Sequence, residues 1–233
     1  MSAEEYDDVP ENPVVEDYVE SADEKATSPL PKRRTTLVAT STQPAPILNT
    51  ENPDTSAVCN LCRCSALEAS PFIIDCSVKE QSELPLDSDW PKNSLITAMD
   101  VNFGDNRFSE LLSLSALSIR RLSFRGNTIQ AIEKAAFVLL SQMDELDLSE
   151  NELSHESLPR QVFQGPFVAG EFEPIPLKTL RLGYNRIRSL DMDALDHLPY
   201  LEVLELNNNP LPVLDRPTEM TISSLRKLKV SSI

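Results

Sequence analysis

Four cysteines lie close together in the sequence, at Cys59, Cys62, Cys64 and Cys76. Thiols at this spacing can form two disulfide bonds in any of three pairings. Alternatively, four thiolates can hold zinc in a tetrahedral site, and the spacing Cys59-x-x-Cys62 is compatible with such a site. Disulfide bonds would suit a short segment that has little hydrophobic core of its own. Either chemistry predicts a small crosslinked unit in this part of the chain.

The other reactive side chains are few and scattered. The two histidines, His155 and His197, fall in different parts of the chain, and the spacing pairs neither of them with a nucleophile. Glu145 and Asp147 are close in sequence, but neighbouring cations and an open surface give no reason for a raised carboxyl pKa. We therefore expect no catalytic residues, no enzymatic activity and no cofactor, and no metal site other than the zinc alternative.

The overall charge limits the possible partners. The chain of 233 residues has 37 acidic and 21 basic side chains, a net charge of −16. Because nucleic acid would be repelled by this charge, we expect no nucleic-acid partner. No apolar run approaches the roughly 18 to 20 residues that cross a bilayer, so we expect no membrane span in this chain. The start, MSAEEYDDVPENP, is not a secretory signal, and an exported form would have a missing or processed start.

The first part of the chain differs in composition from the rest. Residues 1–58 contain 12 acidic and four basic residues and are rich in Pro, Ser and Thr. No apolar period of a strand or helix appears there, so we predict a disordered acidic tail. Tyr6 in EEYDD and Tyr18 in EDYVE are flanked by carboxylates, as in tyrosine-sulfation substrates, which requires passage through the secretory route. The alternative is an unmodified, solvated acidic tail.

A repeated pattern, L-x-x-L-x-L-x-x-N-x-L, follows later in the chain. Four copies match it: IRRLSFRGNTI (119–129), MDELDLSENEL (143–153), LKTLRLGYNRI (177–187) and LEVLELNNNPL (201–211). With the incomplete LRKLKV at 225, successive copies begin 24, 34, 24 and 24 residues apart. An earlier degenerate copy with Met99, Val101 and Asn106 fits if two residues are inserted after Val101. The chain therefore repeats a unit of 24 residues.

Each repeat predicts one coil of a solenoid with one strand in a parallel sheet. In the third copy, Leu180 and Leu182 would point into the core while Arg181 faces outward. The recurring Asn follows the strand, where the backbone turns away from the sheet, and its amide can satisfy buried backbone groups. We therefore predict a structural ladder of stacked asparagines, formed by Asn106, Asn127, Asn151, Asn185 and Asn209.

These repeats resemble the leucine-rich repeat family, in the 24-residue form that is common outside cells. The four cysteines, followed by Leu84-Pro85 and Trp90-Pro91, resemble the family's cysteine-rich amino-terminal cap. The resemblance implies an α/β leucine-rich repeat solenoid with a curved parallel sheet on its concave side and an irregular or short helical convex side. It also implies disulfides that join Cys59 with Cys64 and Cys62 with Cys76. The expected domains are the tail (1–58), the cap (59–94) and about five repeats plus an incomplete last one (95–233).

Residues that face outward from the strands predict a surface striped with charge, because equivalent positions of successive strands lie about 4.8 Å apart. One row reads Arg120, Asp144, Lys178, Glu202 and Arg226, and a second reads Ser123, Asp147, Arg181, Glu205 and Lys229. The alternating charges either compensate one another or bind an equally patterned protein, as the family's use of the concave face implies. The candidate ligand-binding residues are Arg121, Arg125, Asp147, Arg181, Tyr184 and Glu205.

The 34-residue copy contains ten additional residues within the stretch QGPFVAGEFEPIP. Gly165, Gly170 and three prolines predict that this stretch continues neither a strand nor a helix and bulges from the coil. Phe167, Val168, Phe172 and Ile175 make it more apolar than a spacer needs. It either folds back onto the convex side or presents a second contact surface.

The resemblance implies a non-enzymatic module that binds a protein ligand, as the extracellular part of a leucine-rich repeat receptor or a matrix protein. The order of acidic tail and cysteine cap is similar to that of the small leucine-rich proteoglycans. The alternative is an intracellular leucine-rich repeat scaffold with reduced or zinc-bound cysteines. The absent signal sequence and the absence of any Asn-x-Ser/Thr sequon favour this alternative.

The final segment, LRKLKVSSI, begins a repeat and stops before its Asn. Since a solenoid needs polar ends, we expect the natural chain to continue into further repeats, a closing cap or a membrane anchor. The identity of the ligand and the oligomeric state stay open.

Overall fold

The computed structural model describes residues 56–66, 70–115, 117–211 and 215–232. Contacts divide the chain into two units, Met1–Pro46 and Ile47–Ile233, and every described residue lies in the second. Tyr6, Tyr18 and nearly all of the predicted tail fall outside the described residues. Sulfation and disorder of the tail therefore stay predictions.

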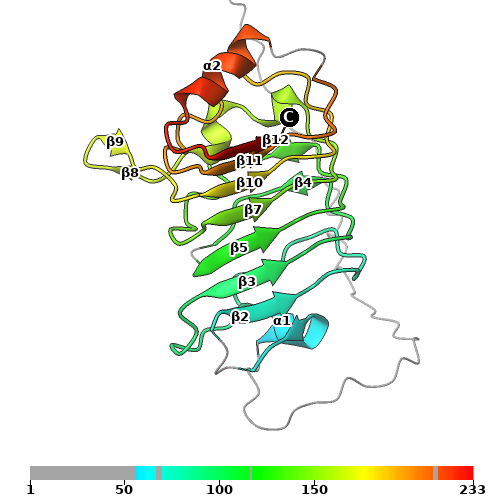
Figure 1. Ribbon diagram of the computed structural model, residues 1–233. Coiled ribbons are helices and arrows are strands. Elements are labelled where there is room, and N and C mark those ends of the chain that lie inside the picture. The colour runs from blue at the N-terminus through cyan, green and yellow to red at the C-terminus, as the bar shows by residue number, and fades with distance from the viewer. Residues whose placement is uncertain (1–55, 67–69, 116, 212–214, 233) are drawn as a thin grey trace, which may run out of the picture. The chain divides into compact units, whose positions relative to one another are not determined.

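One sheet of eight strands runs through the second unit in the order β1-β2-β3-β5-β7-β10-β11-β12 (Figure 1). All pairs from β2 onward are parallel, and only β1 runs antiparallel to its neighbour. The strands are β1 (Arg63–Cys64), β2 (Phe72–Asp75), β3 (Met99–Asn102), β5 (Ile119–Ser123), β7 (Glu145–Asp147), β10 (Thr179–Arg181), β11 (Val203–Glu205) and β12 (Val230–Ser232). Each coil thus contributes one strand, which is the arrangement that the repeat predicts.

The rest of each coil consists of short elements and turns. They are α1 (Ala57–Leu61), β4 (Glu110–Leu111), β6 (Ala131–Ile132), the 3-10 helices η1 (His155–Ser157) and η2 (Arg160–Phe163), the hairpin β8 (Phe167–Val168) and β9 (Glu171–Phe172), and α2 (Arg216–Ser224). None of the described helices is long and apolar enough to cross a bilayer. A parallel-strand solenoid with few helices confirms the predicted fold class.

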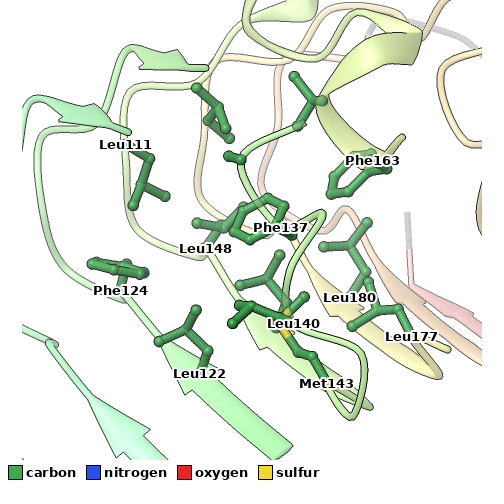
Figure 2. Close-up of a cluster of buried hydrophobic side chains, with 14 of the residues drawn as sticks. Leu111, Leu122, Phe124, Phe137, Leu140, Met143, Leu148, Phe163, Leu177 and Leu180 are labelled. Carbon is green, nitrogen blue, oxygen red and sulfur yellow. The ribbon is translucent and has the colours of Figure 1, made fainter. Parts of the chain in front are cut away.

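The core lies between the sheet and the opposite wall of the coils. Leu122 and Leu180 point inward from β5 and β10 (Figure 2). Phe124 and Leu148 lie just after β5 and β7 and are also buried in the core. Phe137 and Phe163 meet them from the far wall, with stacked rings 6.0 Å apart. All these side chains are fully or almost fully buried. The alternation of leucine with polar residues therefore puts the apolar side chains on one side of the sheet.

The asparagines stack where the backbone leaves the sheet. The amide nitrogen of Asn127 donates to the carbonyls of Phe124 in its own coil (2.9 Å) and of Phe103 in the preceding coil (3.0 Å). Its amide oxygen accepts from the backbone nitrogen of Phe108 at 3.1 Å. Asn106, Asn151, Asn185 and Asn209 make the same kinds of bond. Each amide thus joins two coils and satisfies backbone groups of both.

The cap covers the first edge of the sheet. Its cysteines are joined as Cys59–Cys64 and Cys62–Cys76, the pairing that the resemblance implies. Because each sulfur is bonded to another sulfur, no thiolate is left for zinc. Helix α1 begins at Ala57, just before the expected start of the cap, and Trp90 packs edge-on against Phe103 of the next coil.

Two details of the predicted register are wrong. Val203 pairs with Val230, 27 residues later, whereas a 24-residue interval would pair it with Lys227. The extra length belongs to α2. After this helix, the Leu228 nitrogen donates to the Leu225 carbonyl, and the Leu201 nitrogen donates to the Leu198 carbonyl in the same way before β11. In the early copy, Val101 pairs with Leu122, so no insertion follows Val101. The irregularity lies instead in β5: Met99 pairs with Ile119 and Asp100 with Arg121, so Arg120 forms a bulge between them.

The ten additional residues project from the coil, as predicted, but the expectation that they form no strand is wrong (Figure 1). They form the antiparallel hairpin β8–β9, with Phe167 opposite Phe172 and Val168 opposite Glu171. The turn between the strands uses Ala169 and Gly170, both with positive φ, so the glycine permits the tight reversal that the prediction attributed to an irregular bulge. The segment can therefore form strands, but strands that pair only with each other.

Candidate protein-binding face

The outward side of β2, β3, β5, β7, β10 and β11, with the turns that follow them, is called the sheet face below. Side chains alternate along a strand, so the residues between the inward leucines project from this face. Parallel pairing in register then brings equivalent residues of successive coils together, for example Asp147, Arg181 and Glu205. The repeat itself therefore creates the rows of charge.

The first row consists of ion pairs between neighbouring strands. Arg120 lies 2.8 Å from Asp100, Lys178 lies 3.9 Å from Asp144, and Lys229 lies 2.8 Å from Glu202. The hydrogen bond from Lys229 lowers the pKa of the Glu202 carboxyl. Lys229 therefore occupies the place that the 24-residue interval assigns to Arg226, because β12 is displaced by the length of α2. The charges of the first row therefore still alternate. In the second row Ser232, and not Lys229, lies beside Glu205, so the predicted alternation is wrong at that end.

A second set of ion pairs combines two contacts between direct register partners with one diagonal contact, between Arg181 and Glu145. Glu145 contacts Arg121 at 3.1 Å and also contacts Arg181. Arg181 reaches Glu205 on the other side at 3.3 Å. Arg121, Glu145, Arg181 and Glu205 thus form one alternating chain of charges across four strands. Since the side chains of Glu145 and Arg181 are only 26% and 31% exposed, water screens this part of the chain less than an isolated surface pair.

Asp147 has a different role from its charged neighbours. Its Oδ1 atom accepts from the backbone nitrogen and the hydroxyl of Ser149, which fixes the turn after β7. Asp75 of β2 makes the same contacts with Ser77, and the hydroxyl bond lowers the pKa of the Asp75 carboxyl. The equivalent Asn102 accepts from the backbone nitrogen of Gly104. At Asp75, Asn102 and Asp147 this row therefore closes turns, whereas Arg181 and Glu205 of the same row form ion pairs.

A shallow hollow of about 200 Å³ lies on the sheet face over β2, β3, β5 and β7. Its lining is mixed, with apolar, polar and charged atoms of both signs. Among the residues that line it are Ile73, Asp100, Asn102, Arg121, Glu145 and Asp147. The Ile73 side chain is 48% exposed although it lies in the sheet. The hollow can therefore accept a protruding side chain, with an apolar contact at Ile73.

The remaining two predicted residues lie in the turns that border the sheet face. Arg125 pairs with Glu150 of the next coil at 2.7 Å. Tyr184 is 55% exposed and has a φ of 56°, a conformation shared by Glu150 and Asn208 at equivalent positions. A non-glycine residue is uncommon at positive φ. The coil geometry holds the Tyr184 ring at the surface in this unusual backbone conformation.

The structure thus links Arg121, Arg181 and Glu205 through Glu145 and separates them from Arg125 and Tyr184. Sequence reasoning omitted Asp100, Glu145 and Ile73 from the candidate site. Asp100 was missed because the insertion predicted after Val101 placed this strand in the wrong register. Glu145 could have been found from its place in the same row as Arg121, which the register pairs with it directly.

The chemical groups on this face are charged, polar and apolar side chains. The charged groups occur as ion pairs or turn contacts, and no group of three His, Cys, Asp or Glu side chains in the described part of the chain could hold a metal ion. Such a surface matches a partner that has charges of both signs in a complementary arrangement. A uniformly charged polymer would meet both attractive and repulsive groups along each row.

Comparison with known proteins identifies the type of repeat. The leucine rich repeat family model matches residues 175–232, which include β10, β11 and β12. This match, the parallel solenoid, the stacked asparagines and the disulfide-bonded cap together show a leucine-rich repeat fold with a cysteine-rich amino-terminal cap.

The chain is similar to two small leucine-rich proteoglycans. Osteomodulin of Mus musculus is 28% identical over 137 residues, which cover 53% of this chain and 32% of that protein. Mimecan of Homo sapiens is 27% identical over 219 residues, which cover 90% of this chain and 64% of that protein. The chain therefore spans less than two thirds of the length of either relative.

A solved structure of an octameric complex of Latrophilin 3, Unc5D and FLRT2 also matches. The matching chain is 23% identical and has a TM-score of 0.43, and the match covers 72% of this chain and 60% of that chain.

Proposed function

We propose that this protein is a non-enzymatic, extracellular recognition module whose sheet face binds a protein ligand. The observation that carries the proposal is the chain of alternating charges through Arg121, Glu145, Arg181 and Glu205, next to the hollow at Ile73. Arg121, Arg125, Arg181 and Tyr184 are the proposed anchors, because Arg and Tyr are enriched among residues that dominate interface energies. Asp147 and Glu205 would set the charge pattern that the ligand must match.

Self-compensation of these charges is the simpler explanation of the ion pairs. An exposed pair contributes only about 0.2–1 kcal/mol to stability, however, so stability gives little reason for six coils to keep the alternation. A protein ligand gives such a reason, since a patterned face rejects partners whose charges do not match. The exposed Ile73 and Tyr184 side chains add apolar contact area that ion-pair compensation does not need.

The extracellular location is proposed from the two disulfides of the cap. Disulfides persist in oxidising compartments and are rare in the cytosol. They count against the alternative of an intracellular scaffold with reduced or zinc-bound cysteines. The proposed location also permits sulfation of Tyr6 and Tyr18, which intact mass measurement of protein secreted from animal cells would detect as added sulfate on the tail.

The test of ligand binding combines a screen with side-chain footprinting. The full chain is screened against a panel of recombinant extracellular proteins, and each binder is examined by hydroxyl-radical labelling of the complex. Tyr184 should be protected from oxidation by the bound protein. Tyr200, which is 39% exposed and lies under the Lys227 ammonium, precedes β11 and belongs to none of the strands and following turns that form the sheet face. It is the matched control and should keep its labelling. Protection of Tyr200 with full labelling of Tyr184 would place the ligand elsewhere.

A further inference from the structure

The hairpin β8–β9 projects to the side of the solenoid, on the left in Figure 1, and is anchored at its base. The Glu173 nitrogen donates to the Pro166 carbonyl at 2.8 Å. Gly165 packs so closely against the Glu173 carbonyl that a Cβ atom there would lie 1.9 Å from the oxygen. The Phe172 ring also meets the edge of His197 at 5.9 Å. These contacts hold the hairpin in one orientation relative to its own coil.

The hairpin presents apolar side chains to solvent. Phe167 is 63% exposed, and Val168 and Phe172 are each 46% exposed. Phe167 and Phe172 contact each other across the strands, with ring centroids 4.9 Å apart and ring planes tilted by 60°, so the two rings form one continuous surface. A connection of ten residues does not require paired strands with aromatic rings in water. Clustered exposed apolar groups of this kind mark contact sites, and a rigid scaffold reduces the entropy lost on binding.

The charge around this surface is negative. Glu171 and Glu173 are the only charged residues in 161–177, and both are exposed. The flanking cations are already paired, Arg160 with Asp193 at 3.7 Å and Lys178 with Asp144 at 3.9 Å. Burial lowers the pKa of His197, with a further contribution from the Arg160 charge, so this ring is uncharged near neutral pH. Two copies of the hairpin would bring four carboxylates together, which disfavours self-association through this surface.

We propose that the β8–β9 hairpin is a second docking surface, separate from the sheet face, for a protein segment that combines apolar side chains with Lys or Arg. The apolar side chains would cover Phe167, Val168 and Phe172, and the cations would lie near Glu171 and Glu173. The ten additional residues of this repeat then serve to display the hairpin.

The experiment finds peptides that bind the hairpin without fixing their sequence in advance. Random peptides displayed on phage are depleted on the full chain carrying Phe167→Ser and Val168→Ser, and are then selected on the unmodified full chain. Neither side chain belongs to the buried core, so the doubly substituted chain should melt at nearly the same temperature. The enriched peptides should contain aromatic or aliphatic residues together with Lys or Arg. Their affinity should fall about tenfold or more on the doubly substituted chain, which corresponds to about 1.4 kcal/mol.

Two further variants locate the binding. Glu171→Gln with Glu173→Gln should lower the affinity for the peptides at low salt. This difference from the unmodified chain should disappear at high salt, because exposed charges are screened. Arg181→Ser with Tyr184→Ser, on the sheet face, should leave peptide affinity unchanged even if the sheet-face proposal fails. Enriched peptides that are acidic or lack apolar residues would overturn the inference. Equal affinity for the Phe167/Val168 variant would do the same, as would a dimer in sedimentation that this variant dissociates.

Discussion

The asparagines are the residues whose role is most completely determined by their position. Asn151 donates to the carbonyls of Phe124, Leu148 and Ser149 and accepts from the nitrogen of Ile129, so one side chain serves four backbone groups. Water cannot replace it because Asn151 is buried. Sequence reasoning could locate this ladder because a buried turn without another partner requires an amide at a fixed place.

Replacing Asn151 by alanine should destabilise the protein by about 2–4 kcal/mol, since several buried backbone groups would lose their partners. Urea unfolding followed by circular dichroism measures this loss. The control is Asn208→Gly in an equivalent turn, where the side chain is exposed and glycine readily adopts the observed φ of 59°. A loss no greater for Asn151→Ala than for Asn208→Gly would show that the ladder contributes little.

The candidate binding residues were less predictable than the asparagines. The outward positions could be assigned from the repeat, but the ion pair between Arg181 and Glu145 is diagonal and depends on side-chain length. Arg120 could not be placed correctly because the β5 bulge shifts the register at that point. Small irregularities of a strand therefore change the contacts of a charged row although the fold is unaffected.

At the scale of elements, each coil depends on its inward leucines. Leu182 is fully buried after β10, in the same layer as Leu148 and Leu206. Leu182→Ala should cost about 2–5 kcal/mol because it leaves a cavity between adjacent coils. The thermal unfolding transition measures the effect, with Leu112→Ala as control because that side chain is 54% exposed. An unchanged transition for Leu182→Ala would contradict the alignment of the repeats.

Helix α2 has a pH-dependent start. The Asp215 side chain caps the helix by accepting from the Thr218 nitrogen at 2.9 Å, and its hydrogen bonds with Thr218 lower the pKa of the Asp215 carboxyl. This stabilisation is present above the pKa of the carboxyl in the unfolded chain and is lost as pH falls through the lower pKa of the folded chain. Asp215→Ala should cost about 1 kcal/mol at neutral pH.

The same substitution should cost less in acid, where the wild-type carboxyl is protonated. Asp215→Asn supplies a cap without a titrating group and should keep its stability relative to alanine at both pH values. Urea unfolding of the three proteins at neutral and acidic pH makes the comparison. An equal cost of Asp215→Ala at both pH values would show that ionisation of the cap does not contribute.

The elements that sequence reasoning missed are those that break the 24-residue interval. Helix α2 lengthens its coil by three residues, and the pattern LRKLKV still fits the wrong register because Leu225 and Leu228 have the required spacing. The hairpin was read as an irregular bulge because the glycines and prolines that permit its turn also disfavour long strands. Local composition did not show that two short segments would pair with each other.

At the scale of the whole molecule, the cap and the solenoid form one core. Cys62 and Cys76 are buried among the first strands, and their disulfide has the larger sequence separation, 14 residues against five for Cys59–Cys64. Replacing both Cys62 and Cys76 by alanine should cost about 3 kcal/mol, and replacing Cys59 and Cys64 about 1 kcal/mol less. Calorimetry tests this order, and a larger loss for the Cys59–Cys64 pair would contradict it.

The central claim is that the sheet face binds a protein ligand, and the most direct test is the affinity of a ligand from the extracellular screen. Titration calorimetry compares the full chain with the chain carrying Arg181→Ser and Tyr184→Ser, and with the hairpin variant Phe167→Ser and Val168→Ser as a matched surface control. The account predicts that the sheet-face variant loses about 30-fold or more in affinity, roughly 2 kcal/mol, with an unchanged thermal transition. The hairpin variant should bind as the wild type does. Equal affinity of the sheet-face variant and the wild type would contradict the claim.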